Sequence, residues 1–325
     1  MKRTLFAFFI ILTAALAACA GAKAPDQGLT TIRLPMGYVA DPQYAPFYVA
    51  VDRGYFAEEG LAIEFDYSFE TDGIALVGAG ELPLAVVSGE QVILARAQGL
   101  PVVYVMQWWQ DFPVAIAALA EAGIREPADL AGRNVGVPGF FGASYVGLVG
   151  LLSANGMTLD DIDANEIGFN QVESLLTGQS EAVVVYINNE PVQLRERGEA
   201  IDIIPVADYA DLVANGILTN EKTIAENPQL VQGFINAFMR GLRDTLADPD
   251  AAYEISKKFV EGLDAGRKGV LEASLPLWGT EPLGRTDPAS WVVTQNVLLE
   301  MGLLAEPLPD LDAAYTNEFV ENATE

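Results

Sequence analysis

Residues 82–119, LPLAVVSGEQVILARAQGLPVVYVMQWWQDFPVAIAAL, contain the pattern that decides the fold. Two short apolar runs, Leu82–Val87 and Val102–Met106, have the length of buried strands, and Gly89–Gln98 between them has the periodicity of a helix. A third apolar run, Val114–Leu119, predicts a strand that leads into a second unit. Strands that alternate with helices are typical of α/β folds with largely parallel sheets.

The alternation continues in both directions along the chain. Before this stretch we expect strands at Thr31–Met36 and Ala62–Ser68, with a helix at Ala45–Arg53 between them. After it we expect strands at Arg133–Val137, Ala182–Ile187 and Ile201–Val206, with helices at Ala143–Asn155 and Pro191–Arg197. The last of these strands is expected to return the chain to the first unit.

Successive helices are expected from Asn220 onward. Three residue pairs, Asn227-Pro228, Asp248-Pro249 and Asp287-Pro288, each join a capping side chain to a proline suited to the first helical turn. We expect these helices to cover the first unit.

The sequence therefore predicts an α/β fold of two lobes joined by two crossing strands. Lobe I is expected to comprise residues 31–115 and 207–325, and lobe II residues 116–206. Two hinged lobes place a ligand in the cleft between them. A single continuous α/β domain is the alternative.

The beginning of the chain has the features of an export signal. A basic start, Met1–Arg3, precedes the apolar run Leu5–Leu16, which is too short for a bilayer span of about 20 residues. The following Leu16–Cys19 resembles the bacterial lipobox, so residues 1–18 are expected to be a signal peptide and Cys19 to be lipidated. Residues 19–30 would then be a tether that holds the protein at the extracytoplasmic face of the cell membrane. A transmembrane anchor and an ordinary secreted protein are the alternatives.

Composition excludes several classes of function. The chain has 45 acidic and 18 basic residues, no histidine and one cysteine, and its formal net charge of −27 is repelled by nucleic acid and by anionic head groups. Without histidine there is no imidazole base or ligand, and acylation of Cys19 would remove the only thiol. A paired-carboxylate hydrolase stays possible on residue counts. We expect a binding protein with no catalytic residue, no metal and no cofactor.

Several segments, in this order and spacing, carry a family resemblance: Ala40–Ala50, Asp52–Phe56, Glu59–Leu61, Gly89–Gln91, Ala95–Pro101, Pro127–Arg133, Tyr186–Pro191, Thr219–Glu221 and Thr316–Glu318. The chain resembles ABC-importer substrate-binding proteins of the thiamine-pyrimidine-synthase-like superfamily. The resemblance implies the type II periplasmic-binding clamshell. It also implies a monomer that delivers a small molecule to a membrane permease.

The loops expected to face the cleft contain many aromatic residues and no Lys or Arg. These loops are Val39–Phe47, Ser88–Gln91, Gln107–Phe112, Gly139–Tyr145 and Tyr186–Glu190. The predicted ligand-binding residues are Asp41, Tyr44, Phe47, Ser88, Glu90, Trp108, Trp109, Asp111, Phe140, Phe141, Tyr145, Tyr186, Asn188, Asn189 and Glu190.

Several of these residues also have a purely structural interpretation. Phe47 lies on the apolar face of its helix, and adjacent Trp108 and Trp109 point to opposite sides, so one of them belongs in the core. Glu90 fits the first turn of a helix, where the helix dipole favours an acid. The segment 188–191 equally fits a cap that opens a helix.

The absence of Lys and Arg from these loops disfavours an oxyanion as the ligand, because proteins usually bind oxyanions with a cationic side chain or a free helix N-terminus. Aromatic faces with acceptors at the rim suit a planar heterocycle that donates hydrogen bonds. Tyr186–Pro191 and Thr219–Glu221 resemble the riboflavin-binding lipoproteins of RibXY-type importers, so riboflavin is the first choice of ligand. A thiamine pyrimidine precursor is the alternative, followed by a sulfonate or nitrate. Related fungal enzymes consume their own histidine and use a cysteine-rich motif, and this chain has neither.

Overall fold

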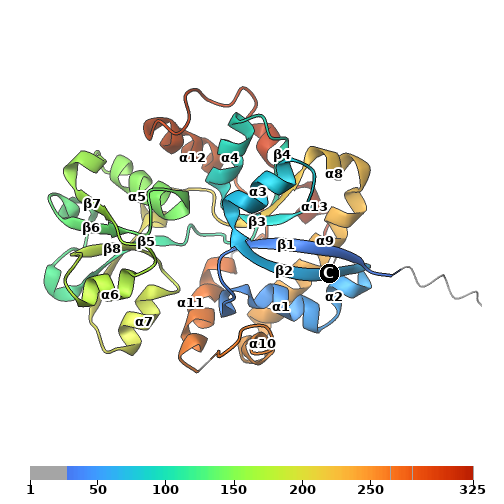
Figure 1. Ribbon diagram of the computed structural model, residues 1–325, viewed down its shortest axis with the longest axis horizontal. Helices are drawn as coiled ribbons and strands as arrows, with labels where there is room; N and C mark the ends of the chain where they lie inside the picture. The colour runs from blue at the N-terminus through green and yellow to red at the C-terminus, as the bar shows by residue number, and fades with distance from the viewer. Residues whose placement is uncertain (1–27, 264, 280, 325) are drawn as a thin grey trace, which may run out of the picture.

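The computed structural model describes residues 28–324 except 264 and 280. The predicted signal peptide, Cys19 and the tether up to residue 27 lie outside the described residues. The chain forms two lobes that lie side by side. The lobe at the left of Figure 1 is built from the middle third of the sequence. Within the described residues, no helix is long and apolar enough to cross a membrane.

Lobe I contains two groups of strands. β1 (Thr30–Gly37) pairs in parallel with β2 (Leu61–Phe69), and β10 (Gly216–Asn220) lies between β3 (Ala85–Val87) and β4 (Val102–Gln107). Its helices are α1 (Ala45–Asp52), α2 (Tyr55–Glu58), α3 (Glu70–Gly78), α4 (Gly89–Ala97), α8 (Glu221–Glu226), α9 (Pro228–Ala247), α10 (Pro249–Ser256), α11 (Lys268–Trp278), α12 (Pro288–Glu300) and α13 (Glu318–Glu321).

Lobe II is a five-stranded sheet in the order β7-β6-β8-β5-β9. Its strands are β5 (Val114–Leu119), β6 (Asn134–Val137), β7 (Asp163–Glu166), β8 (Ala182–Tyr186) and β9 (Ile201–Pro205). The helices α5 (Gly142–Ala154), α6 (Gln171–Leu176) and α7 (Glu190–Glu196) cover it. The chain passes between the lobes twice, from β4 to β5 and from β9 to β10.

The prediction of largely parallel sheets is wrong, because the three-stranded sheet of lobe I is antiparallel and the five-stranded sheet of lobe II is mixed. β10 is antiparallel to β3 and β4, and β5 is antiparallel to β8 and β9. The crossings explain this difference. β5 and β10 each enter their lobe at the interface between lobes and run away from it, whereas β3, β4, β6 and β8 end there.

The predicted helix starts at the Asx-Pro pairs are confirmed. The side chains of Asn227, Asp248 and Asp287 accept hydrogen bonds from backbone N–H groups in the first turns of α9, α10 and α12, and each following proline occupies the first turn. The elements that were not predicted include α2, α3, α6, β7, β10 and α11. α3 follows β2 without a turn residue between them, so the alternating pattern of β2 conceals where the helix begins.

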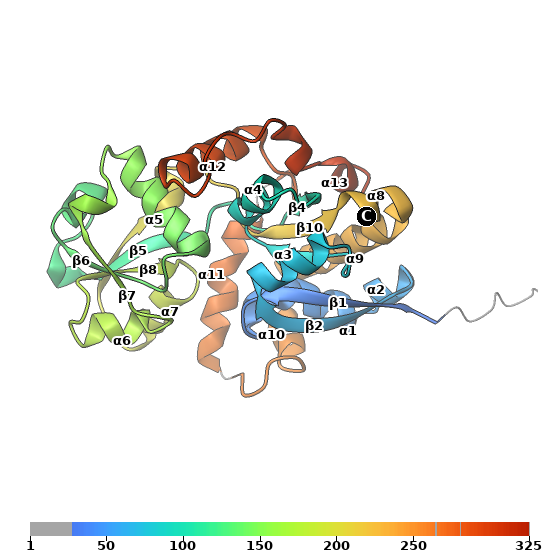
Figure 2. The ribbon, with the colours of Figure 1, turned by 45° about the horizontal axis from the view of Figure 1, so that its top comes forward.

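Two helices bridge the lobes. α12 contacts α4 of lobe I and α5 of lobe II, and α11 packs against α10 on one side and α7 on the other. Figure 2 shows α11 standing between the two lobes. α11 therefore lies at the interface between the two lobes, and its contacts with α7 would change if the lobes moved apart.

Candidate functional site

A cavity of about 430 Å³ lies between the lobes, within the size range of small-molecule sites. Its lining residues follow the carboxyl ends of β1, β2, β4, β6 and β8, the position at which open α/β sheets bind ligands. The lining residues are Met36, Gly37, Tyr38, Gln43, Tyr44, Phe69, Glu70, Thr71, Val86, Gln91, Trp108, Trp109, Pro138, Gly139, Phe141, Gly142, Ala143, Ser144, Phe169, Gln171, Tyr186, Asn189, Glu190 and Asn215. We call this space the aromatic cavity.

Four large rings form the deep part of the aromatic cavity. Trp109, from the first crossing, meets Tyr186 of lobe II edge to face, with ring centroids 6.4 Å apart. Trp108 lies against Tyr44, with ring centroids 5.7 Å apart. The hydroxyl of Tyr44 donates to the carbonyl of Met36 at 2.8 Å, which fixes the ring. Burial of Tyr44, Trp108 and Trp109 restricts the movement of these three rings.

Three phenylalanine side chains at the rim are exposed, which is unusual for this residue. Phe69, Phe141 and Phe169 are 62%, 59% and 60% exposed, and all three line the aromatic cavity. Phe141 lies over Gly139, where a Cβ atom would come within 2.3 Å of the ring. Rings that remain exposed around a cavity offer apolar surface for a ligand to cover.

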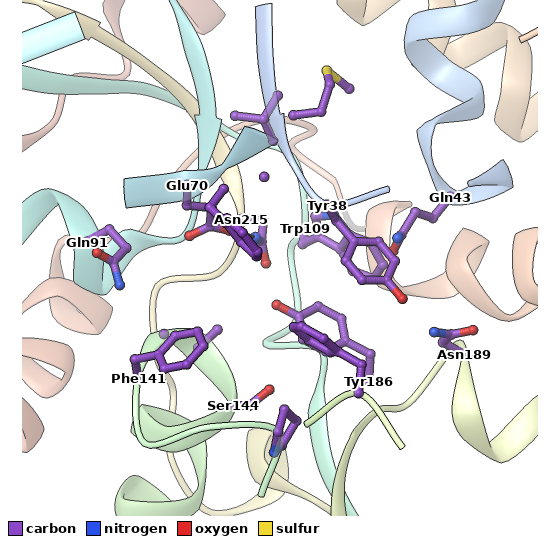
Figure 3. Close-up of a pocket in the computed structure, with 18 of the residues that line it drawn as sticks. Tyr38, Gln43, Glu70, Gln91, Trp109, Phe141, Ser144, Tyr186, Asn189 and Asn215 are labelled. Atoms are coloured by element: carbon purple, nitrogen blue, oxygen red, sulfur yellow. Dashed lines mark hydrogen bonds between the residues drawn. The ribbon is translucent and has the colours of Figure 1, made fainter. Parts of the chain in front are cut away.

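Glu70 supplies the central acceptor of the lobe I wall. One of its carboxyl oxygens accepts from the backbone N–H and the hydroxyl of Ser88, at 3.2 and 2.6 Å. The other accepts from the side-chain amide of Asn215 at 3.1 Å. Figure 3 shows Glu70 and Asn215 together on one side of the cavity, with Tyr186 and Phe141 opposite.

A second carboxyl, Glu90, lies behind Glu70 and shares Ser88 with it. The Ser88 hydroxyl oxygen is 2.6 Å from both carboxyls. A hydroxyl has one hydrogen to donate, so one of the two carboxyls must be protonated and donate to Ser88. Burial, followed by the charge of Glu70, raises the pKa of Glu90 to about 8. Burial raises the pKa of Glu70 as well, but three hydrogen bonds from Ser88 and Asn215 favour its charged form. We therefore assign the proton to Glu90 at neutral pH, with Ser88 donating to Glu70.

Glu190 is the carboxyl of the lobe II wall. It accepts from the backbone N–H of Tyr186 at 2.9 Å and from the side chain of Asn189 at 3.1 Å. Burial raises its pKa to about 7. The cavity thus has an acceptor carboxyl on each lobe.

Two buried polar atoms on the wall have no hydrogen-bond partner among the described residues. They are the indole N–H of Trp108 and the side-chain carbonyl of Asn215. Buried polar groups are almost always paired in native proteins. Both atoms have almost no accessible surface, so a ligand does not reach them directly in this conformation.

The structure brings seven of the predicted site residues to the aromatic cavity. They are Tyr44, Trp108, Trp109, Phe141, Tyr186, Asn189 and Glu190. Both tryptophans line it, although the sequence predicted that one would lie in the core.

The other eight predicted site residues do not line the cavity. Phe47 is buried against Phe238, with ring centroids 4.4 Å apart, and Ser88 and Glu90 lie behind Glu70. Asn188 is buried against α11, where its side chain donates to Ser274.

Of the remaining four, Asp41 is buried and the other three are partly or fully exposed. Asp41 is buried in an ion pair with Arg267, and Asp111 is exposed on the surface. Phe140 is exposed with its ring against Tyr145, at 5.4 Å between centroids.

Sequence reasoning missed Glu70, Tyr38, Phe169 and Asn215. The first three follow the carboxyl ends of β2, β1 and β7, a position typical of ligand contacts. The ends of β1 and β2 were predicted within one residue, so Tyr38 and Glu70 could have been named, whereas β7 was not predicted. Asn215 comes from the second crossing and reaches the site only through tertiary folding. The described lining residues include no Lys or Arg, as the loops predicted, but Arg267 stands beside the cavity. In the described part of the chain, no group of His, Cys, Asp and Glu could hold a metal ion.

Residues 41–252 match the family described as "NMT1/THI5 like". The chain belongs to this family. One relative, named riboflavin-binding protein RibY of Chloroflexus aurantiacus, is 40% identical over 94% of this chain and 90% of its own length. Another, the formylaminopyrimidine-binding protein of Halalkalibacterium halodurans, is 31% identical over 71% of each chain.

The NMT1/THI5-like chain has the fold of periplasmic binding proteins. The periplasmic aliphatic sulphonate-binding protein SsuA of Escherichia coli superimposes with a TM-score of 0.72, covering 87% of this chain and 91% of that one. Its sequence is 15% identical, so this likeness speaks for the fold alone.

Proposed function

We propose that the chain is the extracytoplasmic solute-binding component of an ABC importer and that it captures riboflavin in the aromatic cavity. The observation that carries the proposal is a cavity lined by eight aromatic side chains and no described Lys or Arg. The aromatic side chains are Tyr38, Tyr44, Phe69, Trp108, Trp109, Phe141, Phe169 and Tyr186, and Glu70 and Asn215 add polar groups to the same wall. The 40% identity to a protein named for riboflavin binding supports the same choice.

The polar groups of the wall match the edge of an isoalloxazine ring. That ring has an imide N–H flanked by two carbonyl groups, which is a donor between two acceptors. Glu70 lines the cavity and offers an acceptor for the imide N–H. We propose that Trp109, Tyr186 and Tyr44 contact the ring faces, and that Glu70, Asn215, Asn189 and Glu190 contact polar atoms.

The test is a fluorescence titration of riboflavin with the purified protein. Indole and phenol rings stacked on an excited flavin quench its emission, so binding should quench it in a saturable way with one site per chain. A thermal-shift panel of riboflavin, formylaminopyrimidine, thiamine, taurine and nitrate tests selectivity, because a ligand stabilises the folded state that binds it. Stabilisation by taurine or nitrate alone would contradict the cavity chemistry.

A thiamine pyrimidine precursor is the second candidate. The relative from Halalkalibacterium halodurans, at 31% identity, is named for binding such a pyrimidine. A pyrimidine would use the Glu70 wall and leave much of the aromatic cavity unfilled. A thermal shift with the pyrimidine and none with riboflavin would decide for this candidate.

We further propose binding without turnover and attachment to the cell membrane through lipidated Cys19. The chain has no histidine, and its single cysteine stands in the lipobox-like segment Leu16–Cys19. Membrane fractionation of the unaltered protein and of Cys19→Ser tests the anchor, since the variant should be released or left unprocessed. The permease would receive the ligand from the lobes as they open.

A further inference from the structure

A second hollow, of about 180 Å³, adjoins the aromatic cavity. The two spaces share five lining residues, which are Tyr38, Phe169, Gln171, Asn189 and Glu190. Tyr38 of lobe I and Phe169 of lobe II stand between them, with ring centroids 6.2 Å apart. We call the second hollow the polar annex, because most of its other lining residues are amides or charged groups: Asn170, Glu173, Gln193, Arg197 and Arg267.

Donors and acceptors alternate on the walls of the polar annex. The side-chain oxygen of Asn189 accepts from Gln193 and from Arg267, each at 3.0 Å. The amide nitrogen of Asn189 donates to Glu190 at 3.1 Å. A hydroxyl group both donates and accepts, so a chain of hydroxyls can join such a network at several points.

Both arginines of the polar annex already have a carboxylate partner. Arg197 donates to Glu173 at 2.7 Å, and Arg267 forms an ion pair with Asp41. The carboxyls of Glu173 and Glu190 line the same hollow. A phosphate dianion has only acceptors and would meet both carboxyls, whereas an uncharged hydroxylated chain meets no opposing charge.

We propose that the ligand has two parts, with its flat ring in the aromatic cavity and an uncharged, polyhydroxylated side chain in the polar annex. This inference rests on the proposed function and extends it, because it selects a flavin with a sugar-alcohol chain over the bare ring. It also separates the flavin from a pyrimidine, which has no such chain and would leave the polar annex empty.

The test compares three flavins on the unaltered full-length protein. Riboflavin has the ribityl chain, lumiflavin has a methyl group in its place, and flavin mononucleotide carries a terminal phosphate on the chain. Dissociation constants are measured by fluorescence quenching. Riboflavin should bind more tightly than lumiflavin by roughly tenfold or more, since several hydrogen bonds are lost with the chain. Flavin mononucleotide should bind more weakly than riboflavin.

A variant confined to the polar annex gives a second measurement. Gln193 lines the polar annex but not the aromatic cavity. Gln193→Leu should therefore weaken the binding of riboflavin by about tenfold and leave the affinity for lumiflavin unchanged. Gln179 is exposed on the same lobe and lines neither hollow, which makes Gln179→Leu the matched control. Lumiflavin binding by Gln193→Leu also shows that the variant is folded.

The outcomes separate this inference from the proposed function. Equal affinity for lumiflavin and riboflavin would overturn the two-part ligand while leaving flavin binding in place. Tighter binding of flavin mononucleotide than of riboflavin would overturn the uncharged chain. Failure of all three flavins to bind would overturn the proposed function, and the inference with it.

Discussion

Asn188 of lobe II donates a hydrogen bond from its side chain to the hydroxyl of Ser274 in α11, at 2.9 Å, and both residues are fully buried. The neighbouring Asn189 accepts from Arg267, which directly precedes α11, at 3.0 Å. The start of α7 is therefore joined to α11 by two hydrogen bonds across the interface between lobes. A ligand shifts an open–closed equilibrium only through interactions that differ between the two states. These two bonds are candidates for such interactions.

The Asn188–Ser274 bond should contribute to ligand affinity. Ser274→Ala leaves the amide of Asn188 buried without this partner when the lobes are closed, which costs on the order of 1 kcal/mol and weakens riboflavin binding by about fivefold. Titration of riboflavin fluorescence measures the effect, and small-angle scattering should show less compaction at a given ligand concentration.

Ser256→Ala is the matched control for this prediction. Ser274 and Ser256 both donate to the carbonyl four residues earlier in their helix, at 2.7 and 2.8 Å, but Ser256 lies in α10. Equal affinity losses in the two variants would show that the bond across the interface has no special role.

The proton shared near Ser88 predicts a dependence of stability on pH. The pKa of Glu90 is raised from 4.5 to about 8 by burial and by the charge of Glu70, so the folded state holds a proton that the unfolded chain releases. Stability from this group is fully present below pH 4.5 and is lost as the pH rises from 4.5 to about 8. Glu90→Gln keeps a donor toward Ser88 without a titratable proton. Its melting temperature should exceed that of the unaltered protein at pH 8.5, with the difference shrinking toward pH 5.

Glu70→Gln is the informative comparison for the pH experiment. Glu70 lines the cavity, so this variant should lose riboflavin affinity, whereas Glu90→Gln should largely retain it. Melting curves of Glu90→Gln and the unaltered protein that stay parallel between pH 5 and 9 would contradict the shared proton.

The ring of Trp109 should contribute directly to ligand affinity. Trp109→Ala removes one face of the cavity. It should weaken the binding of riboflavin by roughly 1–3 kcal/mol, by analogy with base stacking on aromatic side chains. Trp109→Phe keeps a flat ring and should lose less riboflavin affinity than Trp109→Ala. Because Trp109 is buried against Trp278, melting temperatures of both variants must be measured alongside affinity. An alanine variant that stays folded and binds normally would place the ligand elsewhere.

The amino-acid sequence predicts the local elements better than their arrangement. Apolar run lengths place β4 and β5 within a residue, and the Asx-Pro pairs place the starts of three helices, because both signals are local. Strand direction depends on where the chain crosses between lobes, which no local pattern records. Hence antiparallel strand pairs appear where parallel ones were expected.

The same distinction applies to the site. Trp109 and Tyr186 follow recognisable strands and were predicted, whereas Glu70 was missed because β2 passes into α3 without a turn. Arg267 and Asn215 lie far along the chain from the predicted loops, and only packing brings them to the site. Glu90 was predicted to contact the ligand, but it lies behind the cavity wall and contacts Ser88, which in turn contacts Glu70.

The packing of α9 on α1 depends on a single glycine in the contact. A Cβ atom at Gly241 would lie 2.2 Å from the carbonyl oxygen of Pro46 and 2.8 Å from the side chain of Ala50, and backbone does not yield as a flexible side chain does. Gly241→Ala should therefore destabilise the protein by about 2 kcal/mol or more, despite the gain of about 1 kcal/mol in helix propensity. Gly233 lies in the same helix, and its added Cβ would meet only the side chain of Glu59, at 3.1 Å. Gly233→Ala should be neutral or stabilising, because that side chain can move. Urea unfolding of the two variants checks the contrast, and equal stabilities would mean that α9 does not approach α1 as closely as described.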